Sequence, residues 1–247
     1  MLRKFLLAIA ACAILGNTSA DAALILAIDT NGAQACATDN NSVCNFGGQI
    51  TDTNPNPNQM AFGGIPVIVG GLSVFGSSQT ATFGPPNNIL NTSSFQITNI
   101  SGVNQVGNFA VSATGFTAPI SFTQVSGGGT LELATGSQIT MQWYADAANA
   151  QGAETSTDTP GTLLHTCSFT AGDASDAFSC APPDIATPFG APYSMTLYTS
   201  FVLTPGGTLV GRSQTELAAV EDVPEPATMA LLGMGLLGAG MARRRRQ

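Results

Sequence analysis

Histidine, the side chain most often used as a catalytic base, occurs once in this chain of 247 residues. A Ser-His-Asp or Cys-His mechanism would therefore have to use His165. This residue lies in the run Leu163-Leu164-His165-Thr166-Cys167, within an expected strand, a setting typical of a structural or surface histidine. The chain also has no Gly-x-Ser-x-Gly, His-Glu-x-x-His or phosphate-loop glycine–lysine motif. We therefore expect that the protein is not an enzyme.

Acidic side chains offer a second kind of chemistry. Glycoside hydrolysis needs two carboxyl groups at a set separation, and Glu132, Asp146 and Glu154 are available for such a pair. Nothing in the sequence indicates that two of them converge. A site here would also have little positive charge with which to orient an anionic substrate, because residues 23–223 contain one arginine and no lysine. A glycosidase-like enzyme is the distant alternative.

One polar segment has side chains of the kind that bind hard cations. Residues 146–158 include Asp146, Asn149, Gln151, Glu154 and Asp158, and calcium prefers carboxylate and amide oxygens such as these. The spacing does not match the EF-hand loop, and a solvated polar loop is the simpler interpretation. The candidate metal ligands are Asp146, Asn149, Glu154 and Asp158, with calcium as the candidate ion. We expect no other cofactor.

Aromatic side chains could stack on sugar rings. Trp143 follows Ile139 and Met141 at alternate positions, which predicts that it faces a core. Tyr144 and Tyr198 have the opposite parity within their expected strands, so they are the better candidates for an exposed face that contacts a glycan.

The cysteines indicate disulfides. Cys12 lies in an N-terminal segment that we expect to be cleaved, which leaves Cys36, Cys44, Cys167 and Cys180. Three pairings are possible in principle, and export to an oxidising compartment favours disulfides. Short loop closures favour Cys36–Cys44 and Cys167–Cys180. The alternative, a zinc site, lacks Cys-x-x-Cys pairs and has one histidine available.

Alternating apolar and polar residues predict the strands that must position these side chains. Their spacing, with glycine or proline between them, predicts an all-β fold, an antiparallel β-sandwich or jelly roll. The expected strands are residues 24–29, 65–69, 72–76, 79–83, 94–100, 106–113, 118–125, 129–134, 139–143, 161–170, 175–180, 193–203 and 207–218.

Helical patterns are weak. The best is residues 145–153, which Gly152 limits to two turns. Residues 52–60 and 181–192 are rich in proline and predict extended loops, because proline disfavours helix at the residue before it.

The charge of residues 23–223 is strongly negative. One cation, Arg212, stands against thirteen acidic residues, which gives −12, compared with −8 for the whole chain. Such a surface repels nucleic acid and acidic polysaccharide unless divalent cations bridge them. We expect no nucleic-acid partner.

The N-terminus has the composition of a secretory signal peptide. Arg3 and Lys4 precede the apolar residues 5–15, and small-residue cleavage sites follow at residues 18–22. Residues 1–22 are therefore expected to direct export through the Sec machinery and to be removed by signal peptidase. A signal anchor is the alternative.

The C-terminal tail begins with the triplet Pro224-Glu225-Pro226, which the two prolines keep extended. Residues 227–242 contain only Ala, Thr, Met, Leu and Gly. As a helix they would be about 24 Å long, slightly short of a hydrocarbon core of about 30 Å, a difference that local thinning can absorb. We expect a single transmembrane helix here, held by cytoplasmic charges at Arg243, Arg244, Arg245 and Arg246.

Triplet, apolar span and terminal arginines in this order resemble the PEP-CTERM sorting signal of Gram-negative bacteria, which exosortases recognise. The resemblance covers residues 223–247. It implies cleavage near the triplet by an exosortase, and transient anchoring in the inner membrane before the protein reaches the cell surface or the exterior.

The expected organisation is a signal peptide (1–22), a β-sandwich ectodomain (23–215), a stalk with the triplet (216–226), a transmembrane helix (227–242) and a charged tail (243–247). The resemblance implies a link to exopolysaccharide and biofilm matrix, where we expect a non-enzymatic structural role. The alternative is a carbohydrate-binding module, calcium-assisted or not, with extracellular polysaccharide as its partner.

Overall fold

A computed structural model describes residues 24–39, 44, 46–62, 65–84, 87–117 and 120–218. The expected signal peptide, the Pro-Glu-Pro triplet, the apolar span and the terminal arginines lie outside these residues. Within them the chain forms strands and no α-helix, so no described helix is long and apolar enough to cross a membrane. The all-β fold expected from the sequence is confirmed for this part of the chain.

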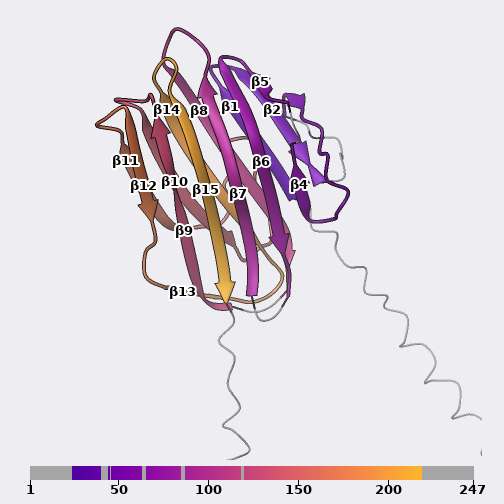
Figure 1. Ribbon diagram of the computed structural model, residues 1–247. Helices are drawn as coiled ribbons and strands as arrows, with labels where there is room; N and C mark the ends of the chain where they lie inside the picture. Colours follow the sequence, from indigo (N-terminus) through magenta and orange to yellow (C-terminus); the bar gives the residue numbers. More distant parts are fainter. Residues whose placement is uncertain are drawn as a thin grey trace, which may run out of the picture.

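The strands form two sheets that pack face to face (Figure 1). The seven-stranded sheet has, in spatial order, β11 (Thr162–Thr170), β10 (Gln138–Asp146), β14 (Tyr193–Leu203), β8 (Gln105–Phe116), β1 (Leu24–Thr30), β2 (Ala33–Thr38) and β3 (Gly48–Gln49). The eight-stranded sheet has β12 (Ser175–Cys180), β9 (Ile120–Glu132), β15 (Thr208–Ala218), β7 (Asn87–Asn99), β6 (Leu72–Thr82) and β4 (Gln59–Ala61), with β13 (Ile185–Phe189) beside β9 and β5 (Val67–Val69) beside β6. All described pairs are antiparallel except β2–β3.

Alternate side chains of both sheets point inward and form one hydrophobic core. In β10, Ile139, Met141 and Trp143 are buried and their neighbours are not, which follows from the two-residue period of a strand. The rings of Phe95 in β7 and Phe109 in β8 stack across the two sheets, with centroids 5.0 Å apart. The parity predicted for Trp143 is confirmed.

Two disulfides stabilise the edges, as the short loop closures predicted. Cys167–Cys180 joins β11 to β12, which are the edge strands of the two sheets on the same side of the sandwich. Cys36–Cys44 ties β2 to the segment after it. The Cα atoms of the pairs are 6.2 Å and 6.3 Å apart.

The prediction of a helix at residues 145–153 is wrong. Ala145 belongs to β10, where it pairs with Met195 of β14. The chain then turns because the Asp146 carboxylate accepts hydrogen bonds from the backbone N–H groups of Ala148 (3.2 Å) and Ala150 (2.9 Å). Local side chain–backbone bonds of this kind compete with a helix.

The two expected loops are partly correct. Residues 52–58 are irregular, and β4 begins at Gln59. The segment 181–192 contains β13, which pairs with β9 through Ile185 and Ala186.

Candidate ligand-binding surface

The outer face of the eight-stranded sheet exposes a row of polar side chains across three adjacent strands. In β15, Gln214 points outward because its neighbours Ser213 and Thr215 are buried. Its Cα partners are Ser126 in β9 and Asn91 in β7. Since neighbouring strands lie about 4.8 Å apart, the row spans about 10 Å.

Arg212 lies on the same face, two residues before Gln214. Its partner in β9 is Gly128, which has no side chain. On the β7 side, Gly211 pairs with Phe95 and Ser213 with Thr92, so an additional residue forms a bulge at Ser93 and Ser94. The missing side chain and the bulge leave space around the guanidinium.

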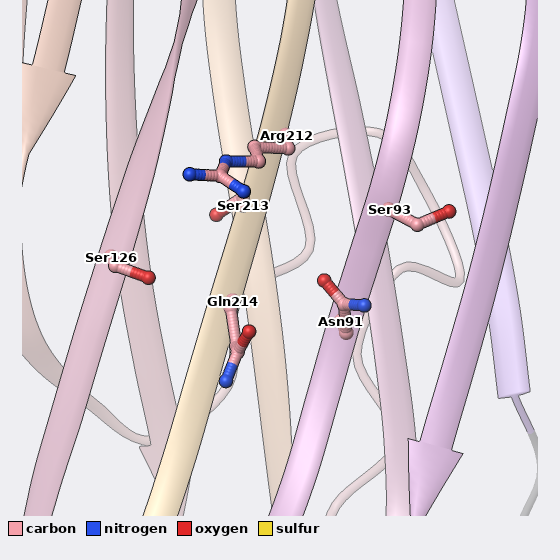
Figure 2. Close-up of a pocket in the computed structure, with 6 residues that line it drawn as sticks. All are labelled: Asn91, Ser93, Ser126, Arg212, Ser213 and Gln214. Atoms are coloured by element: carbon pink, nitrogen blue, oxygen red, sulfur yellow. The ribbon is translucent and has the colours of Figure 1, made fainter.

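This space is a depression of ≈ 310 Å³. Figure 2 shows the Arg212 side chain extending from β15 towards β9, with the side chains of Gln214 and Asn91 beside each other further along the strands. The residues that line it are Asn91, Ser93, Ser126, Arg212, Ser213 and Gln214.

Two further hollows continue the depression along β15. One, of ≈ 330 Å³, shares Arg212 and Ser93 and includes Phe178 of β12. The other, of ≈ 230 Å³, shares Ser126 and Gln214 and includes Asp184 and Glu216. We call the three together the β15 groove.

Some side chains of the groove already have hydrogen-bond partners within the protein, and others do not. At the acidic end, Asp184 accepts a bond from Gln124 (2.9 Å) and Glu216 accepts one from Asn87. Within the described part of the chain, the side chains of Asn91, Ser126 and Arg212 form no hydrogen bond or ion pair. These three are free to bind a ligand.

Sequence reasoning did not identify this groove. It noted Arg212 only as the lone cation of the ectodomain. The available signal was the lone cation of the ectodomain at an outward position in an expected strand, but the row needs the register of three strands that are distant in sequence.

The tyrosines chosen from the sequence lie on the outer face of the other sheet. Tyr198 pairs with Gln142, and the Tyr144 hydroxyl donates to the side chain of Gln142 (3.2 Å). The Tyr198 hydroxyl donates to Asn108 (2.7 Å), whose side chain donates to Asp29 (3.0 Å). The outward parity of both tyrosines is confirmed, and their contact with a glycan stays a prediction.

Tyr198 is less accessible than its parity indicates. It packs against a small apolar cluster that includes Phe46 and Ala153, from segments that cover this face. This burial raises the pKa of Tyr198 above its ordinary value, opposed by a hydrogen bond with Ser200 and reinforced by the Asp29 carboxylate and by Tyr144. Tyr193 is fully buried, which raises its pKa more strongly against the opposing hydrogen bond with Asn88.

Three of the four candidate calcium ligands accept hydrogen bonds from backbone N–H groups. Among the described residues, the carboxylates of Asp146, Glu154 and Asp158 do not form a group with ligand atoms within 4.8 Å of one another. Asp146 holds the turn after β10, Asn149 accepts a bond from the Gly115 N–H (2.8 Å), and Asp158 accepts one from the Glu154 N–H (3.4 Å).

His165 lies close to Cys167 and Cys180, with ligand atoms within 4.8 Å. Both cysteine sulfurs are bonded to each other, so they are not thiolate ligands. The imidazole instead lies beside the Trp143 ring, with centroids 6.1 Å apart. This is the setting expected of a structural histidine.

Two of the three carboxylates considered for glycoside hydrolysis, Glu132 and Asp146, are widely separated. Glu132 ends β9, and the following short connection leads into β10, which ends at Asp146. Glu132 and Asp146 therefore lie at opposite ends of the sandwich and cannot act as a pair.

The comparison with protein families identifies the tail. Residues 222–246 match the PEP-CTERM protein-sorting motif. This match confirms the resemblance of the tail to the PEP-CTERM sorting signal, and the motif implies a surface protein that an exosortase processes. No curated protein matches its sequence.

Solved structures resemble the sandwich only remotely. A carbohydrate-binding module, TmCBM61 in complex with β-1,4-galactotriose, is 8% identical with a TM-score of 0.31, covering 60% of this chain and 89% of its own. The C-terminal CBM6 of a laminarinase from Zobellia galactanivorans is 11% identical with a TM-score of 0.24, covering 49% and 79%. Likeness at this level carries no argument about function.

Proposed function

We propose that this protein is a non-enzymatic structural component of the exopolysaccharide or biofilm matrix, delivered through its C-terminal sorting motif. The match at residues 222–246 is the observation that carries the proposal. Before processing, residues 227–242 anchor the protein in the inner membrane, and cleavage near Pro224–Pro226 then places the sandwich outside the cell.

The described part of the chain suits a non-reducing exterior. It contains two disulfides, one of which joins the edge strands of the two sheets, and such bonds persist in oxidising compartments. The ectodomain has a single cation, so its excess negative charge keeps it soluble and limits non-specific adhesion to anionic surfaces.

Replacing Pro224, Glu225 and Pro226 together with alanine tests the sorting step. We expect the unprocessed protein to accumulate in the membrane fraction and to be depleted from the extracellular matrix, measured by immunoblotting of fractionated cells. Glu221→Ala, just outside the matched residues, is the control and should fractionate as the unmodified protein does. Normal appearance of the triple variant in the matrix would contradict the proposal.

Deletion of the protein tests the structural role itself. We expect a matrix of lower cohesion, measured as the shear stress that detaches a biofilm. An unchanged matrix in the deletion strain would contradict the structural role but would not contradict the proposed sorting step.

The second candidate function is that of a carbohydrate-binding module, and the β15 groove favours it. Amide and hydroxyl side chains without partners inside the protein can donate to and accept from sugar hydroxyls. Titration of the secreted, processed protein with oligosaccharides tests this candidate, and an absence of binding to acidic and neutral sugars alike would exclude it.

A further inference from the structure

Arg212 is an unusual residue for its surroundings. It is the only lysine or arginine among the described residues, yet none of their many carboxylates pairs with it. An exposed guanidinium with no protein partner retains all of its donors, arranged in a planar fork that matches a carboxylate or a sulfate.

The rows of the β15 groove differ in chemistry. A row here is an outward residue of β15 together with its partners in β7 and β9. Arg212 supplies positive charge in the first row. The next row holds the neutral side chains Ser126, Gln214 and Asn91, and the row after it holds Glu216. Arg212 and Glu216 are four residues apart, about 14 Å along the strand. This distance exceeds the screening length of about 8 Å at physiological ionic strength, so Glu216 does not cancel the attraction of an anion to Arg212.

We infer that the β15 groove binds a saccharide with one acidic unit, its carboxylate or sulfate held by Arg212 and its hydroxyls held by Asn91, Ser126 and Gln214. The inference rests on the carbohydrate-binding candidate and specifies its ligand. Glycans also need a shallow and open surface. Gly128 and the Ser93 bulge provide that surface, since Gly128 has no side chain and the Ser93 side chain points away from Arg212 (Figure 2).

The overall charge restricts the number of acidic units. The ectodomain carries an excess of negative charge, and a chain with an acid on every sugar would be repelled by it. The groove has one cation, followed by a neutral row and then an acidic one. The matching ligand therefore has an isolated acidic unit next to neutral sugars.

Binding of three trisaccharides to the secreted, processed protein tests this inference by calorimetric titration. The first is glucuronosyl-xylobiose, which has one carboxylate. The second is its carboxyl-reduced form, identical except for the charge, and the third carries one sulfate ester in place of the carboxylate. We expect the acidic sugars to bind about 10- to 100-fold more tightly than the reduced form, since a hydrogen bond to a charged group contributes about 1.5–3 kcal/mol. The ratio of the first to the third distinguishes carboxylate from sulfate.

Arg212→Gln should reduce the affinity for the acidic trisaccharides to that of the reduced form and leave the reduced form's affinity unchanged. Arg212→Lys keeps the charge but loses the fork, so it should give an intermediate affinity. Gln138→Glu is the charge-matched control. It lowers the net charge by the same one unit on the outer face of the seven-stranded sheet and should not change binding.

The outcomes separate the two proposals. If Arg212→Gln binds the acidic trisaccharides as tightly as the unmodified protein, or if the reduced form binds equally well, the inference is overturned while carbohydrate binding stands. If the unmodified protein binds none of the three, both the inference and the carbohydrate-binding candidate fail. Thermal unfolding of each variant checks the fold, which should be unaffected because Arg212 has no partner within it.

Discussion

Individual glycines allow close packing around β9. Gly127 faces the core, where an added Cβ would lie 2.6 Å from the Met141 methyl group and 3.0 Å from the Trp143 ring. Gly211 in β15 faces Phe95, and an added Cβ would lie 2.9 Å from the end of the Phe95 ring. The glycine run in β9 therefore allows neighbouring side chains and strands to pack closely against it. From the sequence, the same run was expected to separate two strands.

Gly129→Ala tests this packing. An added Cβ would overlap the Val210 carbonyl oxygen and lie 2.8 Å from the Gly211 Cα, so backbone atoms would have to move. Overpacking of a tight site costs about 1–3 kcal/mol, and we expect the free energy of unfolding in urea to fall by this amount. Gly102→Ala, where nothing lies within 4 Å, should leave it unchanged or slightly raised. Equal stabilities of the two variants would contradict the packing role.

Some single-residue features were predictable and others were not. The parity of Trp143, Tyr144 and Tyr198 follows from the two-residue period alone, so the sequence predicted it correctly. The partial burial of Tyr198 depends on segments that cover it from elsewhere in the chain. The groove around Arg212 likewise depends on pairing between β15 and strands far away in sequence.

At the level of elements, the alternation of apolar and polar residues predicted the positions of most strands. Glycines inside strands led to wrong predictions of where strands end. Residues 72–76 and 79–83 are one strand, β6, with a bulge near Gly76, and residues 118–125 and 129–134 are one strand, β9. Strands β2, β3 and β4 were not predicted. They are short and contain few β-branched or aromatic residues, and their pairing rather than their composition defines them.

The Cys167–Cys180 disulfide is an element-level constraint because it joins the two sheets at their edge strands. Replacing both cysteines with serine should lower the free energy of unfolding by about 2–4 kcal/mol, since the bridge restricts the unfolded chain. Urea denaturation under non-reducing conditions measures the loss. Hydrogen exchange should also accelerate in β11 and β12.

The matching double serine variant at Cys36 and Cys44 is the control for this prediction. It closes a shorter loop, with a sequence separation of 8 against 13, and does not join the sheets. It should leave exchange in β11 and β12 unchanged. If both double variants accelerate exchange there equally, the bridge between the sheets has no special role.

Charge is a property of the whole molecule. With one cation in the ectodomain, most acidic groups repel one another, and this repulsion destabilises the compact state. Raising the salt concentration from 10 mM to 200 mM shortens the range of the repulsion, so we expect the midpoint of thermal unfolding to rise. A variant with Glu132→Gln and Asp173→Asn should respond less. A midpoint that falls with salt would mean that attractive pairs dominate instead.

The position of β15 has a mechanical consequence. It is the last described strand before the sorting tail, and it lies inside its sheet between β7 and β9 (Figure 1). A pull on the C-terminal side is directed along this strand, so the hydrogen bonds of both flanking ladders must shear together instead of opening one by one. Tension between a surface attachment at the tail and a glycan held on the same strand would follow this single path and would not cross the rest of the sandwich.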